Sequence, residues 1–502
     1  MTRPAAEKVR RGRASSRVAV CAGLLVSLAL GLAAAPAARA AARAPVPVSV
    51  AVDARDPLPP VPSSFFGLSF ELASLPRVAS YANRGDLVAL LRSLGSGVLR
   101  FGGVSADTRV AWTDEATPAP AWATSTVQPA DLRALAGLAA KTGWRILLTL
   151  GLGHFEPEAA AREAAVAKAA LGDWLQAIEL GNEPNAWALH GLRAEPWTLA
   201  AYDGQVAAYR SAIEAVAPGI ALAGPDTSGS SAFENWGVDE VVDERPALLT
   251  GHHYALGCTA RPAPTIAKLL SPLTRQLEEA SLGRYLSVAR AGETPFRLDE
   301  TNNVSCGGVT GISDTFASAL WAVGYLTRAM TLGVEGINLH ANQANCGGYA
   351  PVCAPTAEDL AAGSLSVQPE WYALRLIDGL VGERPLPTVT SSPAQPNVQV
   401  TTMLASDGRL QFVIVDDDPP GARPVVARLK VGRAFGSGSI LSLTAPSPAA
   451  VTGIRLGGRG IAPDGSWAPP RRLPRVANRR GAVAVRIVPS SAALVTVSAK
   501  AR

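Results

Sequence analysis

The sequence has few of the residues that build metal sites and nucleophile sites. Its 502 residues include five cysteines and five histidines, with no Cys-x-x-Cys pair and no histidines at the spacing of zinc ligands. The Gly-x-Ser-x-Gly, His-Glu-x-x-His and P-loop lysine motifs are also absent. These absences exclude most serine hydrolases, zinc proteases and phosphoryl-transfer enzymes. We expect no structural metal and no cofactor.

The first 40 residues account for the positive charge of the chain. The formal net charge is +5, and residues 1–40 contribute +6 from seven basic residues and one acidic residue, so the remainder stands at −1. The basic start, the apolar run over residues 18–35 and the Ala-x-Ala site at residues 38–40 predict a secretion signal over residues 1–40, cleaved near Ala40. We therefore expect a secreted or periplasmic protein with no membrane attachment in its mature form. The alternative is an uncleaved membrane anchor, because the apolar run is long for a signal peptide.

Four cysteines remain once such a signal is removed, an even number in a chain bound for an oxidising compartment. Two disulfides are therefore expected among Cys258, Cys306, Cys346 and Cys353. The residues alone leave the three possible pairings open.

Between residues 60 and 385, short apolar runs of β type alternate with Ala/Leu-rich stretches of helical period. Eight such runs begin at residues 65, 97, 145, 177, 220, 248, 295 and 335. Eight βα units predict an α/β fold of the TIM-barrel type, a (β/α)8 barrel over residues 60–385. Almost every run begins apolar and ends in polar or small residues. This favours the barrel over an open doubly wound sheet, because a barrel places its active site at the carboxyl ends of all its strands.

The composition of the sequence changes after the predicted barrel. Residues 386–502 contain short strands punctuated by Pro, Gly and Ser, which predicts an all-β sandwich domain. The stretch VPVSVAVDA, within residues 41–59, reads as a strand that has no place in the barrel. We expect it to pair with the C-terminal sheet.

Two glutamates end the fourth and the seventh apolar runs. Glu183 stands in IELGNEPN and Glu300 in PFRLDETNN. Hydrolysis of a glycosidic bond needs one carboxylic acid that protonates the leaving oxygen and one carboxylate on the other side of the bond. We assign Glu183 as the acid/base and Glu300 as the nucleophile of a retaining reaction, which requires the two about 5 Å apart. Glu179, near the opposite end of the fourth strand, is expected to be structural.

Polar neighbours favour these roles. Asn182 can bond a sugar hydroxyl beside the reaction centre. The pair His253 and Tyr254 on the sixth run is expected beside the nucleophile, where a phenol or an imidazole holds a carboxylate ionised and oriented. The competing interpretation is that the rim carboxylates merely pair with arginines such as Arg100.

Four stretches resemble the retaining glycosidases of glycoside hydrolase family 79, which include β-glucuronidases and heparanases. They are LRFGGVSADT, ELGNEPN, GHHY and ETNNVSCGGVTGISDTFASALW, and the resemblance covers the predicted barrel from about residue 60 to 385. GIAPDGSW, further on, resembles the β-domain of that family. Asn-Glu-Pro recurs across barrel glycosidases, whereas the segment that follows Glu300 is much more specific.

The resemblance implies a set of substrate contacts. In that family a glycine-rich stretch after the nucleophile and a tyrosine in the loop after the eighth strand hold the glucuronate carboxylate, and the matching residues here are Gly307, Gly308 and Tyr349. Exposed amides in a tight loop form an anion-binding concavity without a fixed positive charge. The strand-one carboxylate of the family, which contacts sugar hydroxyls, corresponds to Glu71.

Cys306 departs from the family pattern, because related sequences have glycine at that position. A disulfide between Cys258 and Cys306, joining neighbouring strand ends, would account for the difference. It would leave Cys346 and Cys353 as a staple of the last barrel loop.

The leading hypothesis is therefore an exported, exo-acting retaining glycosidase that removes β-linked glucuronic acid or 4-O-methyl-glucuronic acid from glycans or glucuronides. A heparanase-like endo-β-glucuronidase is the alternative, but the near-neutral charge of the mature chain favours exo action. A hypothesis of another class is a non-catalytic carbohydrate-binding barrel. In each case the expected partner is a carbohydrate, and no nucleic-acid partner is expected.

Overall fold

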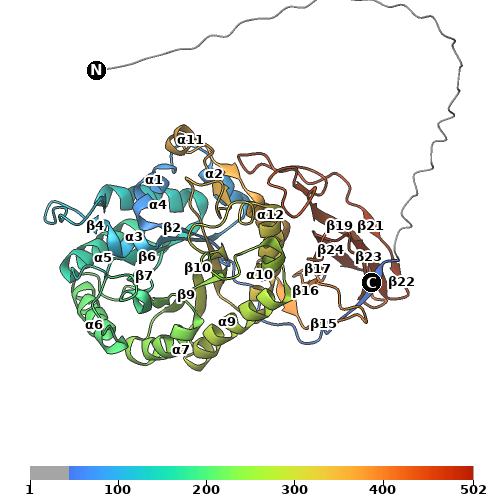
Figure 1. The fold of residues 1–502 in the computed structure, drawn as a ribbon, viewed down its shortest axis with the longest axis horizontal. Coiled ribbons are helices and arrows are strands. Elements are labelled where there is room, and N and C mark those ends of the chain that lie inside the picture. Colours follow the sequence, from blue (N-terminus) through green and yellow to red (C-terminus); the bar gives the residue numbers. More distant parts are fainter. Residues whose placement is uncertain (1–43, 501–502) are drawn as a thin grey trace, which may run out of the picture. The chain divides into compact units, whose positions relative to one another are not determined.

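The computed structural model describes residues 44–500, and the predicted secretion signal lies outside them (Figure 1). Eight parallel strands close into a barrel in chain order. They are β2 (Phe66–Glu71), β3 (Gly97–Gly102), β6 (Trp144–Leu150), β7 (Leu175–Leu180), β8 (Leu222–Thr227), β9 (Leu248–Leu256), β10 (Phe296–Val304) and β11 (Gly336–His340). The eight apolar runs of the sequence form these strands, so the predicted (β/α)8 barrel is confirmed and the open-sheet alternative is wrong.

Helices follow the barrel strands and surround them (Figure 1). They include α1 (Leu75–Ser80), α2 (Leu87–Ser93), α3 (Val104–Thr108), α4 (Pro129–Thr142), α5 (Pro157–Leu171), α6 (Leu199–Val216), α7 (Ser230–Asp239), α9 (Pro272–Ala291), α10 (Phe316–Leu332) and α12 (Pro369–Ile377). Local sequence sets their ends. Helix α4 begins with Pro129 in its first turn, has a capping box between Gln128 and Asp131, and ends at Gly143 in the left-handed conformation.

The C-terminal domain consists of two sheets packed face to face. One has the order β15-β1-β18-β23-β22 and the other the order β14-β16-β17-β24-β19-β20, with β21 paired to β19. Their strands are β1 (Val46–Val52), β14 (Arg384–Leu386), β15 (Thr388–Ser391), β16 (Val398–Leu404), β17 (Leu410–Asp416), β18 (Val425–Lys430), β19 (Phe435–Thr444), β20 (Arg455–Leu456), β21 (Arg475–Val476), β22 (Asn478–Arg479), β23 (Ala482–Ile487) and β24 (Ser491–Ala499). Alternate apolar residues of both sheets form a separate core, so the predicted β-sandwich is confirmed.

Strand β1 lies inside the five-stranded sheet of this sandwich. It pairs in parallel with β18 and antiparallel with β15. The segment that precedes the barrel in the sequence is therefore a structural part of the domain that follows it.

Helix α10 is apolar around its whole circumference because it is enclosed on all sides. It contacts α12 of the barrel and strands β16 and β17 of the sandwich. Its one charged residue is Arg328, whose guanidinium contacts Gln399 of β16 and Glu278 of α9.

Both disulfides of the hypothesised pairing are present. Cys258 and Cys306, with Cα atoms 6.0 Å apart, join the loops after β9 and β10, and Cys346 and Cys353, with Cα atoms 5.4 Å apart, close a short loop after β11. Among the helices of residues 44–500, none combines the length and the apolar character needed to cross a membrane.

Candidate active site

A cavity of about 610 Å³ opens at the carboxyl ends of the barrel strands. Seven of the nine site residues predicted from sequence line it: Glu71, Asn182, Glu183, Tyr254, Glu300, Gly307 and Tyr349. They come from β2, β9, β10 and the loops after β7, β10 and β11. Closure of the barrel is what brings these distant segments together.

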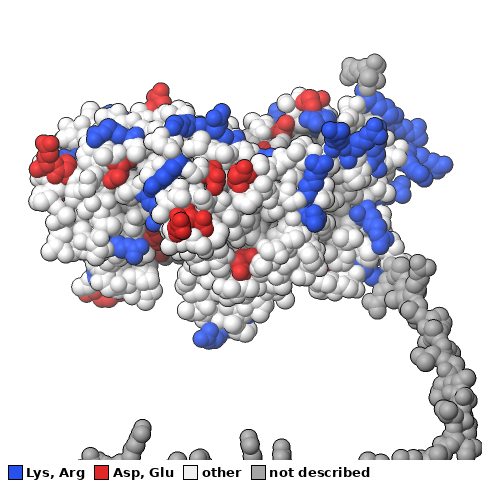
Figure 2. Space-filling model, turned by 90° about the horizontal axis from the view of Figure 1, so that it is seen from above, with Lys and Arg blue, Asp and Glu red and all other residues white. Residues whose placement is uncertain are grey.

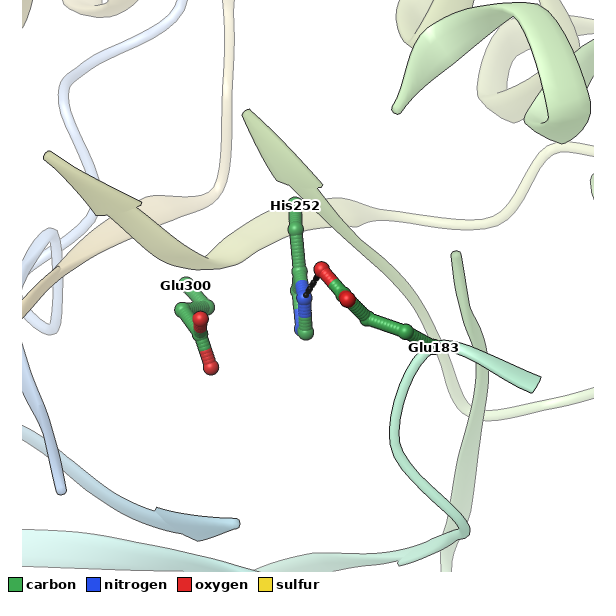
Figure 3. A group of neighbouring side chains, drawn as sticks. All are labelled: Glu183, His252 and Glu300. Carbon is green, nitrogen blue, oxygen red and sulfur yellow. Dashed lines mark hydrogen bonds and ion pairs between the residues drawn. The ribbon is translucent and has the colours of Figure 1, made fainter. Parts of the chain in front are cut away.

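Glu183 and Glu300 face each other across this cavity with His252 of β9 between them (Figure 3). One carboxylate oxygen of each glutamate and a ring nitrogen of His252 all lie within 4.8 Å of one another. Glu183 adopts a left-handed conformation with φ of 49°, and its N–H donates to the carbonyl of Asp226 at 3.0 Å. This turn, continued by Pro184, aims the carboxylate away from the end of β7 and into the cavity.

Arg100, fully buried on β3, connects most of the carboxylates beneath the cavity. Its Nη1 donates to Glu300 at 2.6 Å and its Nη2 donates to Asp226 at 2.7 Å. Its Nε lies 3.1 Å from Glu179 and 3.0 Å from Asp299. Pairing with Arg100 is therefore no alternative to a catalytic role, because the arginine pairs with the nucleophile candidate at the floor of the same cavity.

A bulge in β10 makes this clustering possible. Leu298 stands opposite Gly251 of β9, but Glu300 stands opposite His252, so Asp299 is the extra residue. In a regular strand Asp299 and Glu300 would point to opposite faces, whereas here both reach the guanidinium of Arg100.

The surroundings of Glu300 keep it ionised. Burial by itself would raise the pKa of Glu300, but His340, His252 and Arg100 together with a hydrogen bond from Tyr254 outweigh it and hold the pKa well below its ordinary value. Tyr254 donates its hydroxyl proton to Glu300 at 2.8 Å. An ionised carboxylate held in one orientation is what a nucleophile needs.

His252, which sequence reasoning passed over, bridges two carboxylates. Burial lowers its pKa, but Asp226, Glu300 and Asp299 raise it well above the ordinary value of histidine. As an imidazolium it donates from Nδ1 to Glu183 at 2.9 Å and from Nε2 to Asp226 at 2.8 Å. It therefore fixes the orientation of Glu183.

The placement of His253 beside the nucleophile is wrong. Its side chain leaves the barrel interior, and its Nδ1 contacts the hydroxyl of Ser281 on α9 at 3.1 Å. Burial lowers its pKa to about 4, so the ring is neutral. Side chains alternate along a strand, so Tyr254 and His252 share the inner face while His253 takes the outer one.

Only one of the two glycines that were predicted to bind an anion lines the cavity. Gly307 lines the cavity, and its N–H donates to the Tyr349 hydroxyl at 3.2 Å. Gly308 does not line the cavity, because its N–H donates to the carbonyl of Ser305 at 3.2 Å and closes the turn. Glycine is required there: φ is +90°, and a Cβ would lie 2.5 Å from the backbone nitrogen of Tyr349.

The side chains of Asn182 and Glu71 each accept one hydrogen bond from the protein. The side-chain oxygen of Asn182 accepts from Arg100 at 2.9 Å, so its amide nitrogen is the atom left for a ligand. The carboxylate of Glu71 accepts from the N–H of Ser105 at 2.9 Å. Each side chain is thus oriented before any ligand arrives.

Besides His340 at the end of β11, three basic side chains of the cavity were not among the predicted site residues: Arg77 on α1, Arg109 just after α3, and His190. The Nε of Arg77 is buried without a hydrogen-bond partner. Within the described residues neither arginine forms an ion pair with an acidic side chain. They lie in helices and loops whose approach to the strand ends no local sequence pattern reveals.

Two groups of side chains bring ligand atoms as close as a metal site does: Glu183 with His252 and Glu300, and Asp226 with His252 and Asp299. His252 belongs to both groups and donates a proton from each ring nitrogen. We therefore interpret both groups as a hydrogen-bond network.

A (β/α)8 barrel that presents two facing carboxylates at the ends of its fourth and seventh strands has the architecture of the glycoside hydrolase class. Comparisons with known proteins find similarity to a β-glucuronidase. A β-glucuronidase of Neurospora crassa is 27% identical over 194 residues, a match that covers 34% of this chain and 34% of that relative. The chain thus spans about a third of the length of the curated relative it matches. No protein-family model matches the chain.

Solved structures of glycosidases share the fold. A 4-O-α-L-rhamnosyl-β-D-glucuronidase from Fusarium oxysporum 12S aligns with a TM-score of 0.70 at 18% identity, covering 90% of this chain and 100% of that one. A GH51 arabinofuranosidase from Xanthomonas axonopodis pv. citri aligns with a TM-score of 0.63 at 14% identity, with the same coverage. The barrel and the sandwich therefore occur together in proteins of this kind.

Proposed function

We propose that the protein is a retaining glycoside hydrolase that cleaves β-linked glucuronic acid, or its 4-O-methyl ether, from glycans or glucuronides. The observation that carries this proposal is the approach of one carboxylate oxygen of Glu183 to one of Glu300 within 4.8 Å. Retaining glycosidases hold their carboxyl groups about 5–5.5 Å apart, whereas inverting enzymes leave about 6.5–9.5 Å for a water molecule.

The reaction would proceed in two displacements. Glu183 protonates the glycosidic oxygen while Glu300 attacks the anomeric carbon, so the leaving alcohol departs and a glycosyl ester forms on Glu300. Glu183, now a carboxylate, takes a proton from water, and the oxygen of that water attacks the anomeric carbon and releases Glu300. His252 positions Glu183 throughout, and Tyr254 and Arg100 hold Glu300 in line.

The uronic acid group of the substrate would be recognised at two places in the cavity. The N–H of Gly307 donates to the hydroxyl of Tyr349 at 3.2 Å and both groups line the cavity, so a carboxylate that displaces this bond would accept from both. Arg77 lines the same cavity and forms no ion pair with an acidic side chain of residues 44–500, so it supplies uncompensated positive charge there. An anionic sugar is favoured over a neutral one by both features.

We further propose that the protein acts outside the cytoplasm. The support is chemical: two disulfides persist in an oxidising compartment and are rare in a reducing one.

The test is release of a chromogenic group from an aryl β-glucuronide, compared with the matching β-glucoside and β-galactoside. We expect the β-glucuronide to be preferred by about 10²-fold or more in kcat/KM, since buried donors are left unpaired by a neutral sugar. The variant Glu300→Gln should be inactive. If wild type and this variant behave alike, the barrel is a carbohydrate-binding protein without catalysis. Equal rates on the three sugars would remove the uronate assignment but leave the glycosidase assignment standing.

A sharper variant tests the anion contact. Arg77→Gln should raise KM for the β-glucuronide about tenfold and leave any β-glucoside activity unchanged. Arg84→Gln is the matched control, because Arg84 is a nearby arginine that bonds Ser80 and does not line the cavity.

A further inference from the structure

The chain after residue 40 is nearly neutral because its two domains carry net charges of opposite sign. Residues 60–385 contain 22 basic and 33 acidic residues, which gives −11, whereas residues 386–500 contain 14 basic and 5 acidic residues, which gives +9. Figure 2 shows Lys and Arg gathered over the C-terminal domain at the right of the view, with acidic side chains mainly over the barrel. The near-neutral net charge of the chain after residue 40 is therefore compatible with a basic surface on one domain.

Four of these cations surround one hollow. The hollow, of about 710 Å³, lies on the seven-stranded sheet of the sandwich. Its lining includes Arg409, Arg471, Arg472, Arg475, Ser439 and Thr496, and we call it the arginine hollow. No acidic side chain lines it.

The register of the sheet explains how the hollow is built. Arg475 on β21 stands opposite Ser439 on β19, and Ser439 stands opposite Thr496 on β24. Thr496 is on the same face as Ala492 and Leu494, which pack against the barrel core. The arginine hollow is thus the part of this sheet face that the barrel leaves uncovered.

The guanidinium groups there have unused binding capacity. Arg471, Arg472 and Arg475 are exposed, and within residues 44–500 none of them forms an ion pair with an acidic side chain. Arg409 is the exception, because it pairs with Asp407 at 2.6 Å. Three unpaired arginines repel one another, and a planar guanidinium is matched to the two oxygens of a carboxylate or a sulfate.

Single-stranded nucleic acid fits this surface poorly. Proteins that bind it supply aromatic side chains on which the bases stack. The only aromatic residues of 386–500 are Phe412, Phe435 and Trp467, which pack in the two hydrophobic cores, and none of them lines the hollow. The lining offers guanidinium and hydroxyl groups, which suit a hydroxyl-rich anion.

We propose that the arginine hollow is a second carbohydrate-binding site, which holds a carboxylate-bearing stretch of an acidic polysaccharide outside the catalytic barrel. The choice of a polysaccharide among polyanions rests on the proposed function. The evidence for an anion-binding surface is independent of that function. A barrel of charge −11 repels a polyanionic chain at long range, so a domain of charge +9 supplies the attraction that brings the polymer to the enzyme.

The experiment measures binding without turnover, using the full chain with the Glu300→Gln substitution. The probe is hyaluronan, in which every second sugar is a glucuronate, with dextran as the neutral counterpart and a DNA duplex as a polyanion without sugar carboxylates. We expect salt-sensitive binding to hyaluronan and none to dextran. The triple variant Arg471→Gln, Arg472→Gln, Arg475→Gln should weaken hyaluronan binding about tenfold or more.

A matched control separates this site from general electrostatics. Arg428, Lys430 and Arg486 are exposed on the outer face of the five-stranded sheet, on the other side of the sandwich. Changing these three to Gln removes the same charge, and we expect hyaluronan binding to weaken less than about threefold. Equal weakening by the two triple variants would show that net charge alone attracts the polymer and would overturn the proposal.

The remaining outcomes are equally decisive. Binding of the DNA duplex as tight as that of hyaluronan would overturn the assignment to a polysaccharide. In the catalytically competent background the hollow variant should hydrolyse an aryl β-glucuronide at the wild-type rate and degrade the polymer more slowly. If the aryl glucuronide is not cleaved at all but hyaluronan binds at the hollow, the proposed function fails and the site stands.

Discussion

The barrel and the sandwich use charge in opposite ways. Beneath its cavity the barrel buries a cluster of charges: Arg100 and His252 are enclosed with Glu179, Asp226, Asp299 and Glu300, all of them less than a tenth exposed. The sandwich keeps its cations on the outside and fills its core with aliphatic residues. Buried charges interact strongly and shift one another's pKa values, whereas exposed charges act at long range and are screened by salt.

This difference assigns a different task to each domain. In the barrel, mutual pairing offsets the cost of desolvating several ions and leaves Glu300 ionised in a fixed position, which suits chemistry. In the sandwich, arginines without partners suit recognition of a large anion. The comparison predicts that variants of the buried barrel cluster affect every substrate and that variants of the arginine hollow affect only polymers.

The largest effect is expected from Glu183→Ala. Without the proton donor, kcat/KM should fall on the order of 10⁴-fold on substrates with poor leaving groups and less on a nitrophenyl glucuronide, which departs without protonation. The loss should be the same for polymer and small substrate once leaving groups are matched. Glu158→Ala, at an exposed glutamate of α5, is the control and should keep full activity. An equal loss on good and poor leaving groups would contradict the assignment of Glu183 as the acid.

Next in size is His252→Gln, with an expected fall in kcat of about 10²-fold, because Glu183 loses the donor that orients it. The same variant should also change how the stability of the fold depends on pH. The folded-state pKa of His252 is raised, so the imidazolium stabilises the fold fully below about pH 6.5 and this stabilisation disappears as pH rises through the folded-state pKa.

Thermal unfolding across pH measures that contribution. The melting temperature of wild type should fall more steeply above neutral pH than that of His252→Gln. Below neutral pH both proteins should show a further slope of the same sign, because burial raises the pKa of Asp299 to about 6 and that of Glu179 to about 7, and each contribution is lost as pH rises from the ordinary pKa of the carboxyl group to the raised one. Parallel curves for the two proteins would show that His252 is neutral in the fold.

A smaller effect should follow from removing the Cys258–Cys306 disulfide by a double substitution to Ser. The bond spans 48 residues, and its loss should cost about 2–4 kcal/mol of the free energy of unfolding. Because Gly307 follows Cys306 directly, KM for the β-glucuronide should also rise. Hydrogen exchange distinguishes the domains: protection should drop in the barrel loops and not in β17 or β24. A drop in the sandwich strands would mean that the two domains unfold together.

The smallest effect is that of salt on activity. Raising sodium chloride from about 0.05 M to about 0.3 M shortens the Debye length and should reduce kcat/KM severalfold on an acidic polysaccharide with terminal β-glucuronate. The rate on an aryl β-glucuronide should change less than about twofold, since its anion contact is inside the cavity. Equal salt dependence for the two substrates would contradict the separate role given to the charges of the sandwich.

Much of this architecture can be predicted from the sequence because the relevant signals are local. Each barrel strand is a short apolar run with polar residues at its end, and the order of the runs is the order of the strands. The catalytic candidates Glu183 and Glu300 stand at two such ends. Their convergence follows from the barrel topology alone.

The errors come from features that depend on register or on distant contacts. His252 could have been found, because residues two apart share a strand face and Tyr254 was already placed inward. The bulge at Asp299 and the approach of Arg77 to the strand ends leave no local pattern. The charge of the sandwich was legible in the sequence, but a net value for the whole chain cancels it against the barrel.

The most direct test of the account is the stereochemistry of the first product. Proton NMR of wild type hydrolysing an aryl β-glucuronide should show the β-anomer of glucuronic acid first, with the α-anomer appearing only through mutarotation, because carboxylates within 4.8 Å support a double displacement. Appearance of the α-anomer as the first product would contradict the roles of Glu183 and Glu300 together.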